Sequence, residues 1–257
     1  MKKKIAMFLA LAMTAATVLT GCGDKTMKYA VEAGSAGESV AKEKGFEINS
    51  VLTQADALME VASGTSDAAI IDLLMAGAMI GEGTSYPNLK YTDKLTTEEY
   101  GIGCRKGSDL ASYINVVLAD TYADGSMLEI AKKYGVQESL VEQKACEYKA
   151  SEKSDVEYIK EKGKLIVGIT DFAPMDYQDE NGQWIGFDAD MAREVAKKLE
   201  VEIEFVVIDW DAKIMELDSK NIDVVWNGMT LTDAVKAAME CTNAYCNNAQ
   251  VVVVPAK

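Results

Sequence analysis

Carboxylates that follow short apolar runs are the side chains of this chain best placed for chemistry. Asp72 ends the run Asp67–Asp72 (DAAIID), and Asp171 follows the β-branched run Leu165–Ile169. Such runs are too short for a helix core and predict buried strands. Ligands of open α/β sheets gather at the carboxyl ends of strands, so both carboxylates are candidates for holding a cation or moving a proton.

The chain contains no histidine, which narrows the chemistry further. Ser-His-Asp and Cys-His nucleophile systems and the usual zinc sites are excluded. Cys104, Cys146, Cys241 and Cys246 match neither a zinc knuckle nor a redox CxxC motif. We therefore expect no metal and no cofactor, while a carboxylate or lysine enzyme stays open. Cys241 and Cys246 could form a local disulfide or remain small buried thiols.

The segment Lys164–Leu199 is central to the positioning of these residues. Its sequence predicts a strand, a loop, a polar turn and an amphipathic helix. A gapless internal similarity joins residues 58–72 (LMEVASGTSDAAIID) to residues 214–228 (IMELDSKNIDVVWNG). Each copy reads as a helix, a turn and a buried strand, so we expect two similar α/β lobes. Asp72 and Gly228 then occupy equivalent strand ends.

A second candidate binding element starts at Ser35, which precedes Glu38 with the spacing of a capping box. The glycine-bearing turn there predicts a helix start whose free N–H groups could hold an anion such as a carboxylate. A plain helix cap without a ligand is the alternative. Residues 81–97 are turn-rich and predict a crossing between lobes.

Composition and the first residues indicate where the chain works. The 257 residues are 49% hydrophobic with a net charge of −15, or −18 without the first 21 residues, which argues against nucleic acid as a partner. Lys2–Lys4 precede an apolar stretch, as in a secretory signal. The following Leu-Thr-Gly-Cys resembles a bacterial lipoprotein processing site, so we expect lipidation of Cys22 and an extracytoplasmic, membrane-anchored protein.

Several longer segments resemble one known family. VGITDFAPMDY, GFDADMAREVAKKL, IDW and NIDVVWNGMTLT resemble the first lobe of the polar amino-acid substrate-binding proteins of ABC importers, the family 3 type with a periplasmic-binding-protein-like fold. Residues 27–80 resemble its second lobe. The resemblance implies an α/β, two-lobed fold in which each lobe is a sheet flanked by helices, with hinge strands between the lobes.

The order of the segments is reversed relative to the family, so the chain resembles a circularly permuted member. We expect a signal peptide at 1–21, a lobe 2-like domain at 22–95 and a returning hinge strand with lobe 1 helices at 96–142. A linker at 143–155 and a lobe 1-like domain at 156–257 follow.

The resemblance also implies a ligand site. Asp72 would pair with a ligand ammonium, aided by the Gly228 carbonyl and the Thr230 hydroxyl. The ligand carboxylate would meet the helix start at Ser35, Ala36 and Gly37. The side chain of the ligand would be surrounded by Asp171, Phe172, Met175 and Trp210. The family usually carries an arginine where this chain has Val235. Arg105 and Arg193 are poor substitutes, so the group that holds a carboxylate stays open.

These features favour a lipid-anchored, monomeric receptor over an enzyme. It would capture a small amino acid or related amine by closure of two lobes and deliver it to ABC permease subunits. One alternative is a carboxylate enzyme similar to cyclohexadienyl dehydratase, with Asp171 and Asp72 as acid and base candidates. A sensory or degenerate binding module is the other. The sequence names no particular ligand.

Overall fold

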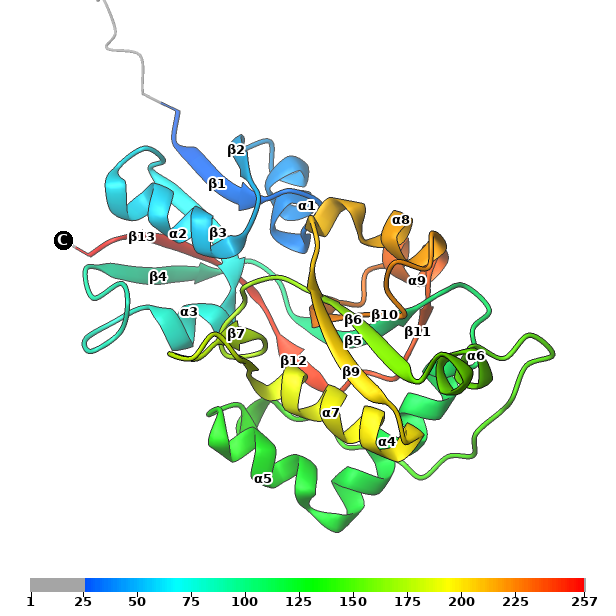
Figure 1. Ribbon diagram of the computed structural model, residues 1–257. Coiled ribbons are helices and arrows are strands. Elements are labelled where there is room, and N and C mark those ends of the chain that lie inside the picture. Colours follow the sequence, from blue (N-terminus) through cyan, green and yellow to red (C-terminus); the bar gives the residue numbers. More distant parts are fainter. Residues whose placement is uncertain (1–25, 257) are drawn as a thin grey trace, which may run out of the picture.

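The structure is a computed structural model that describes residues 26–256, and it contains two separate mixed sheets (Figure 1). The signal peptide at 1–21 and Cys22 lie outside the described residues. The first of the two sheets, called the β1 sheet, has the strand order β2-β1-β3-β13-β4. Its strands are β1 (Lys28–Glu32), β2 (Glu47–Val51), β3 (Ala68–Asp72), β4 (Leu89–Lys94) and β13 (Gln250–Pro255). Strand β1 pairs in parallel with β2 and β3, whereas β13 is antiparallel to β3 and β4.

The second, called the β6 sheet, has the order β11-β5-β10-β6-β9, and β12 also pairs with β5. Its strands are β5 (Glu98–Cys104), β6 (Lys164–Ile169), β9 (Glu202–Val207), β10 (Val224–Thr230), β11 (Glu240–Cys241) and β12 (Cys246–Asn248). A small hairpin of β7 (Tyr177–Gln178) and β8 (Trp184–Ile185) forms a third sheet. The predicted α/β class with two sheets flanked by helices is confirmed.

Helices accompany each sheet (Figure 1). With the β1 sheet lie α1 (Ala36–Glu43), α2 (Gln54–Ser63) and α3 (Leu73–Met79), and together they form the β1 lobe. The β6 lobe contains the β6 sheet with α4 (Leu110–Asp124), α5 (Ser126–Lys133), η1 (Gln137–Ser139), α6 (Asp155–Lys162), α7 (Phe187–Leu199), η2 (Trp210–Ala212), α8 (Lys213–Asp218) and α9 (Asp233–Ala238). No helix within 26–256 has both the length and the apolar composition needed to cross a membrane.

Local sequence signals account for several helix ends. The Thr53 side chain accepts from the Asp56 backbone, and the Asp56 side chain accepts from the Thr53 backbone, so α2 begins with a complete capping box. At α1 the Ser35 Oγ accepts the Glu38 N–H at 3.0 Å, whereas the Glu38 carboxylate accepts the Gly34 N–H. The predicted box at Ser35 is therefore half made, because Glu38 reaches one residue further back.

Two extended segments cross between the sheets and contact each other. The chain passes from β4 to β5 through residues 95–97 and from β12 to β13 through Ala249. The Leu95 N–H donates to the Gln250 carbonyl at 2.8 Å, and the Gln250 N–H donates to Thr96 Oγ1 at 2.8 Å. These paired crossings form a two-strand connection about which the lobes could turn.

The last strand lies outside the sheet to which its residue range had been assigned. Strand β13, red in Figure 1, runs between β3 and β4 in the β1 sheet, although it belongs to the range 156–257 expected for the other lobe. Hydrophobic burial explains the placement, because Val251 and Val253 are 1% and 0% exposed in that sheet.

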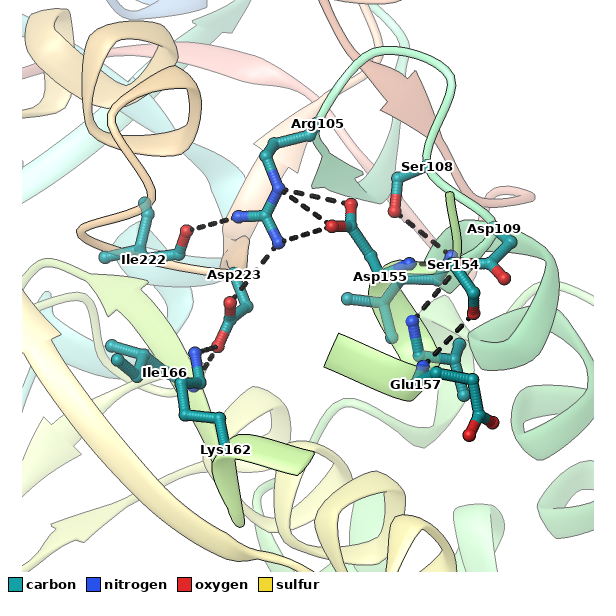
Figure 2. A network of polar contacts seen from close by, with 12 residues as sticks. Arg105, Ser108, Asp109, Ser154, Asp155, Glu157, Lys162, Ile166, Ile222 and Asp223 are labelled. Carbon is teal, nitrogen blue, oxygen red and sulfur yellow. Dashed lines mark hydrogen bonds and ion pairs between the residues drawn. The ribbon is translucent and has the colours of Figure 1, made fainter. Parts of the chain in front are cut away.

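The expected linker at 143–155 is attached to the β6 lobe. Helix α6 already begins at Asp155, and Asp109 Oδ1 accepts the N–H groups of Asp155 and Val156. Figure 2 shows this segment beside Arg105, whose guanidinium forms ion pairs with Asp155 at 3.0 Å and Asp223 at 3.4 Å. Most of 143–153 has no regular secondary structure, yet its end is held by these polar contacts.

Candidate functional site

A cavity of about 220 Å³ lies where the two lobes face each other. The carboxyl ends of β1 and β3 contribute to one wall and the end of β10 to the other, as expected for a ligand site in α/β sheets. The β1 lobe supplies Glu32, Gly34, Ser35, Ala36, Ser39, Gln54 and Asp72. The β6 lobe supplies Trp210, Lys213, Ile214, Asn227, Gly228, Met229, Thr230, Thr232, Ala234 and Val235.

Six residues named from the sequence come together around this cavity. They are Ser35, Ala36, Asp72, Trp210, Gly228 and Thr230. Their convergence brings strand ends and a helix start from both lobes to one space, so a single small ligand could touch both lobes at once. Whether they bind a ligand stays a prediction.

Four other candidates lie elsewhere. Phe172 and Met175 are 2% and 0% exposed and belong to the hydrophobic core. A Cβ on Gly228 would lie 2.3 Å from Phe172 Cε1, so the Phe172 ring packs beneath the cavity wall. Gly37 is buried, and a Cβ there would lie 2.9 Å from Gln250 Oε1. Asp171 lines a different cavity together with Lys133, Tyr134 and Pro174. The lining of this cavity thus omits Asp171, Phe172, Met175 and Gly37, and their contact with a ligand stays a prediction.

Asp72 is buried within a dense set of donors. Its Oδ1 accepts the Tyr100 hydroxyl at 2.7 Å and the amides of Gln250 and Asn248, while its Oδ2 accepts the Gln54 amide. Burial, and then the charge of Glu98, raise the pKa of Asp72 to about 7 against these hydrogen bonds. The carboxyl is thus held in a fixed orientation by its donors.

Glu32 is a second buried carboxyl in the cavity and was not expected from the sequence. It ends β1, is 3% exposed, and its Oε1 has no hydrogen-bond partner. Burial, and then the charge of Asp72, raise the pKa of Glu32 to about 8, although Lys213 and Gln54 lower it. An acidic oxygen without a partner inside a cavity is poised to accept a hydrogen bond or pair with a cation.

Lys213 supplies a cation to the same cavity. Its Nζ donates to the Trp210 carbonyl at 2.8 Å and, across the lobe boundary, to the Gly34 carbonyl at 3.0 Å. Burial lowers the pKa of Lys213 to about 8 against the charges of Glu32 and Asp211, which raise it. Because an ammonium has three N–H groups, one remains for a further acceptor.

Sequence signals for both missed residues exist. Glu32 ends a short strand with a carboxylate, as Asp72 does, and the same strand-end argument applies to it. Lys213 lies four residues before the buried Leu217 on a helix face expected to be apolar. A charged residue in an apolar position is the pattern that would have identified it.

Thr230 and Gly228 already have protein partners. The Thr230 hydroxyl donates to Glu98 Oε2 at 3.0 Å, and the Gly228 N–H donates to Asp188 Oδ2 at 2.7 Å. Gly228 adopts a φ of 57°, a left-handed conformation that glycine tolerates without a Cβ penalty. The Gly228 backbone is therefore fixed where β10 meets the cavity.

The two arginines considered as replacements for the arginine that is absent at position 235 form other contacts. The Arg105 guanidinium also donates to the Ile222 carbonyl at 2.9 Å, and Lys162 joins the same network through Asp223 (Figure 2). Arg193 pairs with Asp190 at 2.9 Å on α7. Neither arginine lines the cavity, whereas Val235 does.

The described residues give no support to a metal site, a disulfide or an acid–base pair. Across 26–256 there is no group of His, Cys, Asp or Glu side chains that could hold a metal ion. Cys104, Cys146, Cys241 and Cys246 are free thiols. Asp171 and Asp72 line different cavities, which gives no geometric support to the pairing of these two residues as acid and base.

Residues 165–257 match the family model described as bacterial extracellular solute-binding proteins, family 3. This part of the chain is similar to that family. It comprises β6 to β13 and therefore supplies Trp210, Lys213 and Gly228 to the cavity. The resemblance to this family noted from the sequence is confirmed over residues 165–257, and circular permutation stays a prediction.

Individual relatives match over similar lengths. The chain is 36% identical over 88 residues to the L-cystine-binding protein TcyJ of Escherichia coli (strain K12), which covers 34% of this chain and 33% of the relative. It is 36% identical over 93 residues to the arginine-binding extracellular protein ArtP of Bacillus subtilis (strain 168), with 36% of each covered. The chain thus spans about a third of the length of these curated relatives. Both are named as binding proteins rather than enzymes.

Solved structures show similar partial matches. Domain 1 from TmArgBP in its arginine-bound form is 33% identical, with 38% of this chain and 84% of that chain covered and a TM-score of 0.31. An ancestral cyclohexadienyl dehydratase is 37% identical over 32% of this chain, also with a TM-score of 0.31.

Proposed function

We propose that this protein binds an amino acid in the cavity between its lobes and delivers it to an ABC importer. The main support is that acidic groups from the β1 lobe and the Lys213 ammonium from the β6 lobe line one cavity. A zwitterion removed from water needs charges of both signs around it. The family of residues 165–257 and the amino-acid-binding relatives support the same assignment.

Lys213 is proposed to hold the ligand carboxylate in place of the missing arginine. It lines the same cavity as Val235, and its bond to the Gly34 carbonyl places it beside the start of α1. The Ser35 N–H already donates to the Glu32 carbonyl, but the Ser35 hydroxyl and the first N–H of α1, at Ala36, can assist Lys213. A single ammonium gives less directional binding than a guanidinium fork, and the backbone N–H groups compensate for this.

Asp72 is proposed to hold the ligand ammonium, with the Gly228 carbonyl and the Thr230 hydroxyl nearby. A carboxylate offers about four acceptor positions, and four side-chain donors already use those of Asp72. An incoming ammonium therefore competes with a neutral amide such as that of Gln54. It would displace this amide because a charged donor forms the stronger bond.

The remaining parts of the proposal concern location and chain order. Export and a lipid anchor at Cys22 are supported by the lysines, apolar stretch and Leu-Thr-Gly-Cys at the start of the sequence. Circular permutation is supported by the pairing of β13 with β3, which joins the family-matched segment to the sheet built by residues 28–94. The proposed partners are the ABC permease subunits and the membrane surface, with the receptor acting as a monomer.

Calorimetric titration with the twenty amino acids and simple amines tests the proposed function. We expect saturable binding of one amino acid or a small group of them, with the ligand recovered unchanged by chromatography. Conversion of a titrated compound into product would favour an enzyme instead. Absence of binding across the panel would contradict the receptor assignment and favour a degenerate module.

A further inference from the structure

The Glu32 carboxyl is a buried acid in the cavity whose role the proposed zwitterion contacts leave unassigned. The pairing proposed above uses Asp72 for an ammonium and Lys213 for a carboxylate. Glu32 lines the same cavity at the end of β1, and its Oε1 is buried without a hydrogen-bond partner. Burying such an oxygen costs free energy, which a ligand group in the cavity could recover.

The charges of the cavity indicate what that group is. Asp72 and Glu32 are acids and Lys213 is a base, all of them less than 10% exposed. A neutral amino acid would leave Glu32 protonated and its Oε1 without a partner. A ligand with two cationic groups and one carboxylate would give Lys213 and both acids, once they ionise, a partner of opposite charge.

The strand register places the two acids at the same end of neighbouring strands, with Glu32 level with Ile71, the residue before Asp72. Strand β1 pairs in parallel with β3, with Tyr29 opposite Ala68 and Ala30 opposite Ala69, so Glu32 and Asp72 end neighbouring strands at the same edge. The electrostatic influence of Asp72 on Glu32 agrees with this closeness. Two cationic groups on one small molecule can therefore reach both acids together.

We propose that Glu32 binds a cationic group on the ligand side chain, so that the protein selects amino acids with an ammonium or guanidinium side chain over their neutral analogues. The proposal rests on the proposed function, because it assumes that an amino acid occupies the cavity. Glu32 then determines specificity and has no catalytic role.

Proton release is a second consequence of this arrangement. Burial raises the pKa of Glu32 to about 8, so its carboxyl is mostly protonated at neutral pH in the empty cavity. A cation beside Glu32 favours the ionised form and drives its proton into solution. Binding of a cationic ligand should therefore release protons near pH 7, and binding of a neutral analogue should release fewer.

Matched ligand pairs test the inference in calorimetry. Arginine is compared with citrulline and lysine with norleucine, on the wild-type chain and on Glu32→Gln, with the exposed Glu43→Gln as the control. Each titration is repeated at pH 7 in two buffers of different ionisation enthalpy to count released protons. Thermal unfolding of each variant shows that it is folded.

We expect the wild type and Glu43→Gln to prefer one cationic ligand over its analogue by about 100-fold, the range of a charge-assisted contact of about 3 kcal/mol. Glu32→Gln should lose most of this preference and the extra proton release. It should still bind the neutral analogue as well as the wild type does.

Three results would overturn the inference. The wild type could bind neutral analogues as tightly as cationic ones, or Glu32→Gln could keep the preference. A folded Glu32→Gln could also lose both ligands equally, which would assign Glu32 to the shared amino-acid contacts. If no amino acid binds the wild type, the proposed function itself fails, and this outcome is distinct from the other three.

Discussion

At the scale of residues, buried carboxyls make stability depend on pH. Burial raises the pKa of Glu32 from 4.5 to about 8 and that of Asp72 from 3.8 to about 7. A folded state whose acids have raised pKa values binds protons more tightly than the unfolded chain. The stability contributed by these groups is therefore present below about pH 4 and is lost as the pH rises through 7 and 8. Such destabilisation is expected of a site built to receive cations.

Glu32→Gln should therefore stabilise the ligand-free protein at pH 8, by up to about 4 kcal/mol from the size of the pKa change. Little difference from the wild type is expected near pH 4, where the Glu32 carboxyl is mostly protonated in both the folded and the unfolded state. Thermal or urea unfolding between pH 4 and 8 measures this, with Glu43→Gln as the control. Parallel pH profiles for wild type and Glu32→Gln would show that the pKa of Glu32 is not raised.

Lys213 offers a test of how a carboxylate is held without the arginine. Lys213→Met should weaken binding of the amino-acid ligand about 10- to 100-fold, since it removes a charge-assisted hydrogen bond of about 1.5–3 kcal/mol. The corresponding amine without a carboxylate should bind both proteins equally. Titrations with both ligands measure this, and Lys236→Met, exposed on α9, is the control. Equal losses for the amine and the amino acid would assign Lys213 to closure of the lobes rather than to the carboxylate.

Asp72 could be placed beside the cavity from the sequence because it is a charged residue at the end of an apolar run, where a strand ends. It could not place Phe172 or Met175, since the residues after a strand can turn toward the ligand or into the core. Here they turn into the core, and Phe172 packs against Gly228 instead. The Asp171 side chain lies at a separate cavity for a similar reason, because the loop path after β6 is set by tertiary packing.

At the scale of elements, β13 is the strand on which the β1 sheet depends. It lies between β3 and β4, and its side chains fill the sheet's apolar faces. Val253→Thr buries a hydroxyl in place of a methyl group and should destabilise the protein by about 1–3 kcal/mol. Val207→Thr, at a site that is 60% exposed, should change stability by less than about 0.5 kcal/mol. Urea unfolding compares the two, and equal stabilities would contradict the central position of β13.

Sequence patterns predicted the helix that ends at Leu199 and the strands that end at Asp72 and Ile169, but they missed β4. Residues 81–97 read as turns because the strand at 89–94 has only one buried side chain, Leu89. Its partner β13 is about 160 residues away in sequence, so no local pattern indicates the pairing. An exposed edge strand of this kind is specified by its neighbour more than by its own residues.

At the scale of the whole molecule, the internal similarity predicted two lobes, because each copy encodes a helix and the buried strand that follows it. The place where the chain crosses between the lobes cannot be predicted from this internal similarity. It depends on the pairing of Leu95 with Gln250, which are far apart in sequence. The family resemblance, rather than any local pattern, supplied the expectation of hinge strands.

The proposed permutation leads to a prediction about chain order. In the β1 sheet, Tyr29 pairs with Ala68 and Val253 pairs with Ala69, so the start of β1 and the end of β13 lie at the same end of β3. A chain that runs from 154 to 256, through a flexible Gly/Ser linker, and then from 26 to 142 can therefore form the same sheets.

We expect this reordered chain to unfold cooperatively and to bind the same ligand with unchanged affinity, since every contact of the cavity is kept. Circular dichroism and calorimetry measure both properties against the original chain. The control carries the same linker but joins residue 256 to residue 54, so that β1, α1 and β2 are lost together with Glu32 and Ser35. A reordered chain that fails to fold would show that the contacts of residues 143–153 with the β6 lobe, such as the Lys149 N–H to Ser112 Oγ bond at 2.9 Å, are required for the fold.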